Sequence, residues 1–328
     1  MTVPVAWNEW TFSYEVKDKA GLGLRDVHYK GVKFLHKASL PVIRVKYEDD
    51  DCGPYQDRIK WGNLAKFTDC GNKKICIKSF SWDGTQWLDL RVGAHIGEYR
   101  IQQLWQLSRD GRIAARVWSR GVSCETDHVH HPYWRLDFDV DGENNNEVLV
   151  KDEDNWGVYT TETAVKKKHG RRWLVRNSAS GHAVWIVPGP NDGTADSFSK
   201  ADLAIRRYHH SEDEPWPFGA KGGLGYDNDE EVRGKDIVVW YIPHLSHSAH
   251  DEEKGSLSEW IKGGPTLEIL PSQILFAGLF GPGEGGQSFV AGLSFDELVQ
   301  LWTDLGKASP PGDMIQMGLF HNFFTQDD

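Results

Sequence analysis

Residues 128–142 of the chain read His-Val-His-His-Pro-Tyr-Trp-Arg-Leu-Asp-Phe-Asp-Val-Asp-Gly. The aromatic and branched residues of the second half predict a strand over Trp134–Val140, and the closing Asp-Gly is typical of a turn. Side chains alternate between the two faces of a strand, so His128 and His130 share one face and His131 points to the other. Two imidazoles on one face could hold a copper, zinc or iron ion with at least one further ligand, or they could form a solvated strand edge.

Similar strand patterns recur on both sides of this stretch and are bounded by turn residues. These predicted strands are 21–29, 32–35, 98–107, 113–118, 172–175, 183–187 and 236–242. Turns at Lys30-Gly31 and at 109–111 join the first two pairs as hairpins. A single helix is predicted, where Ser294 and Glu297 form a capping box. The chain has no internal repeat and no linker, so we expect residues 1–328 to form one mostly β domain, a large antiparallel β-sandwich with little helix.

Composition excludes several classes of protein. With 39% hydrophobic residues, 15 Trp and 34 Gly in 328 residues, the chain can bury a large core and favours a turn-rich β protein. The net charge of −11 argues against a nucleic-acid partner, which would require a dominant basic face. No apolar run approaches the roughly 20 residues that cross a bilayer, so no membrane association is expected. The first residues show no secretory signal, which predicts a cytoplasmic protein.

Two further groups of polar residues could complete metal sites. Asp137 and Asp139 share a strand face, and two carboxylates suit a hard ion such as Ca²⁺, although a polar turn that enters a loop has the same pattern. His244, His247 and His250 follow a later predicted strand. Any of these three could supply the further ligand that the first pair of histidines needs.

Taken together, these segments resemble the catalytic β-sandwich domain of the copper-containing amine oxidases. In that family a His-x-His strand runs five residues ahead of Arg-Leu-Asp-x-Asp-Val-Asp-Gly, and His130 and Arg135 keep that spacing. The family's third copper histidine lies seven residues after a strand Trp, as His247 does after Trp240. The segments that resemble the family are 10–47, 135–142, 172–177, 204–226 and 318–327.

The resemblance implies two metal sites. Copper would be bound by His128, His130 and His247. The family's structural calcium site would correspond to three aspartates, the last standing eleven residues before the third histidine: Asp137, Asp139 and Asp236. The family is dimeric and oxidises small amines with O₂, so the resemblance also implies a homodimer with a small-molecule substrate.

The resemblance further implies a cofactor made from the protein itself. Family members convert a tyrosine near the copper into topaquinone, and alignment on Trp105 and Gly111 places that tyrosine at Tyr99. Glu98 and Arg100 flank it, where the family has Asn and an acid, and they would surround the cofactor. From the residues alone, Tyr99 could equally be a strand tyrosine packed in the sandwich.

Upstream residues match the family's gate and catalytic base. The family places a gate tyrosine two residues before a catalytic aspartate, which corresponds to Tyr55 and Asp57. An aspartate in an apolar pocket would have a raised pKa, suited to taking a proton near neutral pH. Asp57 could instead be an ordinary loop acid.

The four cysteines carry a separate prediction. Cys70 and Cys76 would form a disulfide as in the family, or would remain a reduced pair. Cys52 and Cys124 are expected to be free thiols, the latter close to the predicted copper histidines.

Three functions fit these residues. The first is copper-dependent oxidation of a primary amine by O₂ through a quinone made from Tyr99. The second keeps the fold and the metal without the quinone, and catalyses another copper-dependent oxidation or a non-redox cyclisation or isomerisation in a biosynthetic pathway. The third is a metal-binding module without catalytic activity.

Overall fold

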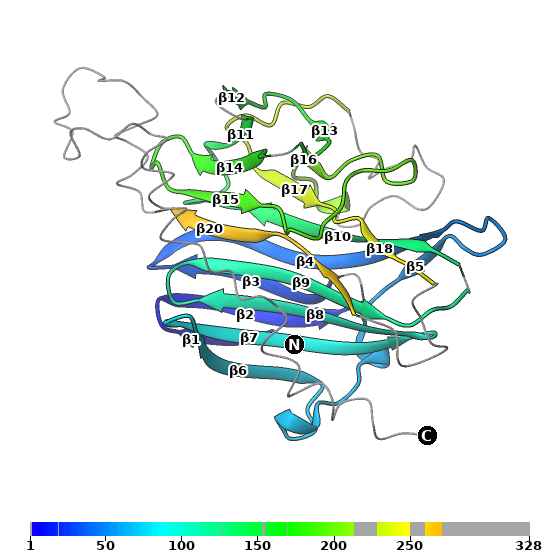
Figure 1. Ribbon diagram of the computed structural model, residues 1–328. Coiled ribbons are helices and arrows are strands. Elements are labelled where there is room, and N and C mark those ends of the chain that lie inside the picture. The colour runs from blue at the N-terminus through cyan, green and yellow to red at the C-terminus, as the bar shows by residue number, and fades with distance from the viewer. Residues whose placement is uncertain are drawn as a thin grey trace, which may run out of the picture.

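Two antiparallel sheets of ten strands each pack face to face (Figure 1). The computed structural model describes residues 2–18, 20–124, 126–152, 155–168, 170–212, 228–249 and 260–270. This arrangement confirms the prediction of a mostly β, antiparallel sandwich. None of the helices in these ranges has the length and apolar character that crossing a bilayer requires. The helix predicted at 294–305 lies outside the described residues, as does His250.

The first sheet contains the histidine-rich strand. In order across the sheet, its strands are β1 (Val3–Trp7), β2 (Trp10–Lys17), β3 (Gly21–Tyr29), β4 (Val32–Tyr47), β10 (His128–Phe138), β17 (Ile237–Tyr241), β16 (Leu203–Arg207) and β13 (Thr163–Val165). Two short strands extend it, with β5 (Tyr55–Asp57) paired to β4 and β18 (Leu245–His247) paired to β10.

The second sheet faces the first. In order, its strands are β12 (Asn155–Val158), β11 (Asn146–Asp152), β14 (Arg172–Asn177), β15 (Ala183–Val187), β20 (Thr266–Leu270), β9 (Arg112–Arg120), β8 (Tyr99–Ser108), β7 (Thr85–Ile96) and β6 (Ile75–Trp82), with β19 (Ile261–Gly263) paired to β9. Three single turns of 3₁₀ helix are the helical elements among the described residues: η1 (Trp61–Asn63), η2 (Thr68–Cys70) and η3 (His210–Glu212).

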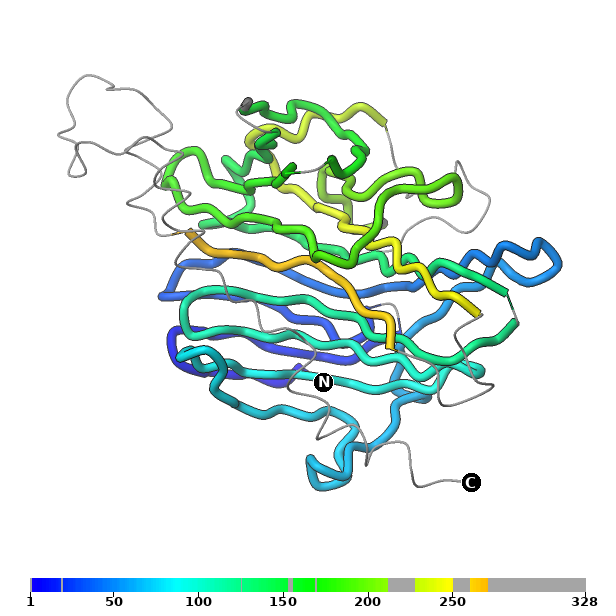
Figure 2. The backbone as a smooth tube through the Cα atoms, in the orientation of Figure 1, coloured from blue at the N-terminus to red at the C-terminus, as the bar shows by residue number. Residues whose placement is uncertain are grey.

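The predicted hairpins form as the turn residues require. Lys30 and Gly31 both have positive φ, 51° and 82°, which is the requirement of a tight two-residue turn between β3 and β4. β4 then continues beyond Leu35, where the predicted strand ended. In Figure 2 the chain that leaves β4 turns at the right of the view and returns toward β5.

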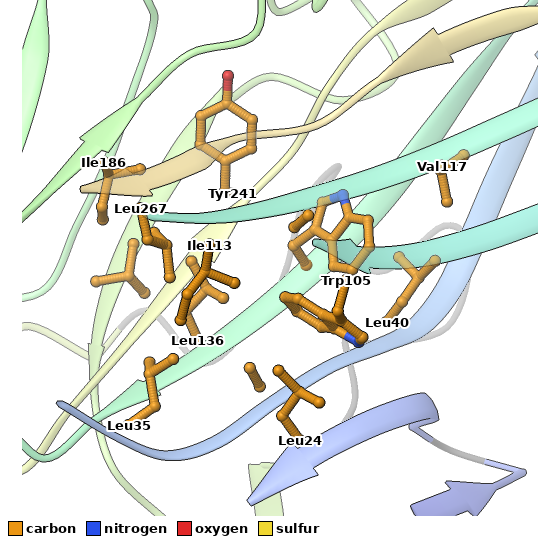
Figure 3. Packing of buried hydrophobic residues seen from close by; sticks show 14 of the residues in the cluster. Leu24, Leu35, Leu40, Trp105, Ile113, Val117, Leu136, Ile186, Tyr241 and Leu267 are labelled. Atoms are coloured by element: carbon orange, nitrogen blue, oxygen red, sulfur yellow. The ribbon is translucent and has the colours of Figure 1, made fainter. Parts of the chain in front are cut away.

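The core lies between the two sheets and combines aliphatic side chains with aromatic ones such as Trp105 and Tyr241 (Figure 3). Trp105 of β8 meets Trp134 of β10 edge to face, with ring centroids 5.0 Å apart. The indole N–H of Trp105 donates to the carbonyl of Leu22 at 2.7 Å, and Gln103 bonds both the N–H and the carbonyl of that residue. Burial of each Trp contributes about 4–6 kcal/mol of transfer free energy. These contacts fix the second sheet against the first close to β10.

Two disulfides link the described chain. Cys52 bonds Cys124, so the prediction that both are free thiols is wrong; the two cysteines are 72 residues apart in sequence, and their Cα atoms lie 6.5 Å apart. Cys70 bonds Cys76, which resolves the two alternatives for that pair. The cytoplasmic location expected from the sequence stays a prediction.

Candidate metal centre

Strand pairing brings the three predicted copper histidines together. His128 of β10 stands directly opposite His247 of β18, and His130 lies two residues further along the same face of β10. All three are buried, and each offers a ring nitrogen within 4.8 Å of the others. The ring centroids are separated by 4.8 to 6.0 Å. The strand pattern and the sequence spacing therefore converge on one place between the two sheets.

The ring of His128 is oriented as a metal ligand requires. His128 Nδ1 lies 3.0 Å from the carbonyl of Thr126 and donates to it, so the lone pair of Nε2 points toward the other rings. Neither ring nitrogen of the fully buried His130 has a hydrogen-bond partner among the described residues. Burial lowers the pKa of His130 well below its ordinary value and, with the neighbouring His128, lowers the pKa of His247 to about 4. Neutral imidazoles are the form that binds a metal ion.

Tyr99 reaches the histidines from the second sheet. Its hydroxyl lies 3.2 Å from His128 Nε2, and its ring stands edge-on to His130 with centroids 5.0 Å apart. Its hydroxyl also bonds the hydroxyl of Tyr47, whose ring stacks on His128 at 4.8 Å. Burial, and then the bond to Tyr47, raise the pKa of Tyr99, so the phenol stays protonated. Tyr47 was missed by the sequence analysis; its register opposite His128 in the β4–β10 pair is the signal that locates it.

The residues beside Tyr99 point elsewhere. Tyr99 is buried, whereas Glu98 is exposed and Arg100 is half-buried. Arg100 lies between His95 and Arg120 in the ladder of the second sheet, and neighbouring strand residues face opposite sides. The structure brings Tyr99 to the histidines and leaves the side chain of Glu98 outside that group.

β5 places the predicted base and gate beside β4. Asp57 stands opposite Ile43 and is 7% exposed, and its Oδ2 has no hydrogen-bond partner in the described chain. Burial raises the pKa of Asp57 to about 7, and its charge in turn raises the pKa of Tyr99. Tyr55 is 46% exposed and packs edge to face on Tyr47, with centroids 5.8 Å apart. Aromatic contacts thus lead from the surface at Tyr55 to the buried histidines.

Comparison with known proteins shows that the chain is similar in structure to several solved proteins. No protein-family model and no curated protein sequence matches this chain. The copper-containing benzylamine oxidase of Hansenula polymorpha superposes with a TM-score of 0.67 at 15% identity, over 81% of this chain and 59% of that one. The Aspergillus nidulans amine oxidase superposes with a TM-score of 0.66 at 17% identity, over 90% of this chain and 58% of that one. The Pichia pastoris lysyl oxidase superposes with a TM-score of 0.63 at 16% identity, over 81% of this chain and 51% of that one. The fold is that of the copper amine oxidases.

The likeness to copper amine oxidases covers part of those enzymes. The chain spans 51% to 59% of the length of these three oxidases. At 15% to 17% identity the comparison shows the fold alone. Within that fold, the group formed by His128, His130 and His247 is compatible with copper.

The copper-amine-oxidase-like sandwich also gathers the three predicted calcium aspartates. Carboxylate oxygens of Asp137, Asp139 and Asp236 lie within 4.8 Å of one another. Arg135 pairs with Asp137 at 3.0 Å, and Lys33 pairs with Asp139 at 2.7 Å. Burial, and then the two neighbouring carboxylates, raise the pKa of Asp236 to about 7. A hard cation at this point would relieve the repulsion among the three groups.

His244 does not join the first group of histidines. It lies with His131, the histidine predicted to point away from His128 and His130, and the two ring centroids are 5.0 Å apart. Among the three histidines that could have supplied the further ligand, the structure places His247 in that position.

Proposed function

We propose that the chain is a copper-dependent oxidoreductase that oxidises a primary amine with O₂ through a quinone made from Tyr99. His128, His130 and His247 would hold the copper, and three imidazoles are ligands that Cu(II) binds well. One observation carries the proposal: the Tyr99 hydroxyl, on one sheet, lies 3.2 Å from Nε2 of His128, a candidate ligand on the other sheet. The fold shared with copper amine oxidases supports the same assignment.

Copper and the quinone would supply the electron-accepting chemistry and the reaction with O₂. The other residues would bind the amine and move its protons. Asp57, with a pKa of about 7, would take the proton from the carbon that bears the amine. Tyr47 would hold the oxygen of the Tyr99 ring through the bond between the two side chains. Tyr55, exposed and packed on Tyr47, would stand at the entrance to the site.

The aspartate group would serve the fold rather than the reaction. We propose that Asp137, Asp139 and Asp236 bind Ca²⁺ between β10 and the residue that precedes β17. A homodimer stays a prediction from the resemblance.

Copper loading in air tests the quinone directly. The metal-free protein should gain visible absorbance, react with phenylhydrazine, and gain two oxygens while losing two hydrogens by intact mass. Tyr99→Phe and His130→Ala should abolish all three changes, whereas His95→Ala, which replaces an exposed histidine on the neighbouring strand β7, should keep them. A copper-loaded protein that stays colourless and unreactive with phenylhydrazine would refute the quinone.

A second candidate function keeps copper and an unmodified Tyr99. The observation that favours it is the sequence Gly97-Glu98-Tyr99-Arg100, in which Glu and Arg replace the flanking residues of the family. In that case Tyr99 would remain a phenol beside the metal, and the protein would catalyse another copper-dependent oxidation or a cyclisation or isomerisation. A protein that binds copper and whose polypeptide mass stays unchanged would support this candidate over the first.

A further inference from the structure

The face of β10 opposite the copper centre carries a second convergence of ligand atoms. His131 of β10, His244 after β17 and Asp196 in the loop after β15 each offer an atom within 4.8 Å of the other two. His131 Nε2 lies 2.7 Å from Asp196 Oδ2, and His244 Nδ1 lies 3.7 Å from the same oxygen. Both histidines are buried, 0% and 3% exposed, while the Asp196 side chain is 31% exposed. We propose that these three side chains form a second site for a divalent transition metal such as Zn²⁺.

The outer nitrogen of each ring is held by a carbonyl. His131 Nδ1 lies 3.2 Å from the carbonyl of Arg44, and His244 Nε2 lies 3.2 Å from the carbonyl of Ala201 and 3.4 Å from Asp202 Oδ1. Histidines that bind metals commonly donate their other N–H to a carbonyl or carboxylate, which fixes the tautomer and directs the lone pair at the ion. With the proton of each ring on the nitrogen that faces a carbonyl, the lone pairs of His131 Nε2 and His244 Nδ1 would both point toward Asp196.

Hydrogen bonding within the protein leaves one atom of this group without a partner. His244 Nδ1 is buried and has no hydrogen-bond partner among the described residues. Both ring nitrogens of His131 face oxygens, and a neutral imidazole has only one N–H to donate. A cation placed between His131 Nε2, His244 Nδ1 and Asp196 Oδ2 would satisfy all three atoms at once.

Hydrogen bonds within its own loop orient the Asp196 carboxylate toward the two histidines. Asp196 Oδ1 accepts the backbone N–H groups of Phe198 and Ser199 at 2.8 and 2.6 Å, so Oδ2 is left to face the histidines. The same loop is tied to the other ligand, because the N–H of His244 donates to the carbonyl of Asp192 at 2.7 Å. The three ligands therefore come from segments that already hold one another in place.

The ligand types select the metal. Two imidazoles and one carboxylate suit Zn²⁺ and related first-row ions, whereas Ca²⁺ and Mg²⁺ prefer oxygen alone. Zinc ligand bonds of about 2.0–2.2 Å place neighbouring ligand atoms somewhat more than 3 Å apart, so the 3.7 Å separation already fits and the 2.7 Å contact would open slightly. The exposed side of Asp196 leaves the fourth position to water or a small ligand.

The test requires that the copper histidines be removed first. In the full-length variant His128→Ala/His247→Ala, Co²⁺ should bind with one equivalent at this site and give the visible absorption of a nitrogen-ligated, four-coordinate ion, and Zn²⁺ should displace it. Adding His244→Gln should weaken Co²⁺ binding by more than about 100-fold, since losing even an outer-shell partner costs 10–100-fold. The matched control is His209→Gln, which removes a half-exposed histidine paired with Glu230 at 2.6 Å.

A second variant keeps the test decisive if His244→Gln does not fold. Asp196→Asn keeps the shape of the side chain and the oxygen that accepts the loop N–H groups, and it should also abolish the visible Co²⁺ band. The alternative is an ion pair between protonated His131 and Asp196 that binds no metal. Absence of the band before any change to His244 or Asp196, or a band that survives Asp196→Asn, would overturn the proposal.

Discussion

Asp57→Asn should stabilise the metal-free protein, and the gain should grow with pH. Asp57 is 7% exposed, and no described group bonds its Oδ2. Burial raises its pKa from 3.8 to about 7. The folded protein therefore holds this proton more tightly than the unfolded chain does, and ionising the carboxyl costs free energy of folding.

The size and sign of the effect follow from the difference between the pKa of Asp57 in the unfolded chain and its pKa in the folded protein. Below about pH 4 the carboxyl is protonated in both states, so it carries no cost there. Between about pH 4 and pH 7 the unfolded chain has released the proton and the folded one has not, so the free energy of unfolding falls by about 1.4 kcal/mol per pH unit. The difference between pKa values of 3.8 and about 7 means that, above pH 7, ionisation of Asp57 lowers the free energy of unfolding by at most about 4 kcal/mol. An Asn side chain has a similar shape and never ionises, so the variant escapes this cost.

Urea unfolding followed by Trp fluorescence, at several values from about pH 4 to pH 8, measures the difference between wild type and Asp57→Asn. The difference should be near zero at the acidic end and largest at the basic end. Asp83→Asn, in an exposed turn where Asn is also tolerated at positive φ, should show no such trend. An Asp57→Asn difference that is the same at every pH would show that Asp57 is not a desolvated acid, and would remove the reason to regard it as a base that works near neutral pH.

Three other changes have expected outcomes. Replacing both Cys52 and Cys124 by Ser removes a cross-link between residues that are 72 positions apart in the sequence. Under oxidising conditions this change should lower the free energy of unfolding by about 4 kcal/mol. An unchanged free energy of unfolding would mean that the two thiols are not bonded in solution. Ca²⁺ should raise the Tm of wild type and not that of Asp236→Asn, since that aspartate lies in the carboxylate group; an equal shift in both proteins would place the ion elsewhere. Tyr47→Phe should cost about 0.5–1.5 kcal/mol in urea unfolding through the lost bond to Tyr99, and a loss no larger than experimental error would contradict that bond.

The sequence predicted the strands best where both faces of a strand are apolar or alternate cleanly. β3 and β15 have the predicted bounds. The apolar pattern predicted a strand over Trp134–Val140, whereas β10 runs over His128–Phe138. The pattern misses the first half of β10 because that half carries histidines and a proline in place of apolar residues. Pairing with β4 and β18 holds that half extended, and such long-range pairing leaves no local pattern.

For the candidate site, sequence spacing located the residues that lie on strands. His128 and His130 followed from strand alternation, and His247 followed from the resemblance to a known family. The other features depend on contacts between distant segments. The bond between Cys52 and Cys124 and the approach of Asp196 to the outer face of β10 arise from loops that fold back on the sheet, and composition alone does not predict where a loop lies.

Both candidate centres depend on the register of β10. Neighbouring strand residues face opposite sides, so His130 can serve the centre between the sheets only while His131 faces outward. A slip of one residue would put His131 opposite Tyr99 and dismantle both sites together. The register is fixed by pairing with β4 on one side and with β17 and β18 on the other. Removing either proposed ion should therefore change the conformation of β10 less than that of the flanking chain, because the paired strands hold β10 extended whether or not its histidines bind metal.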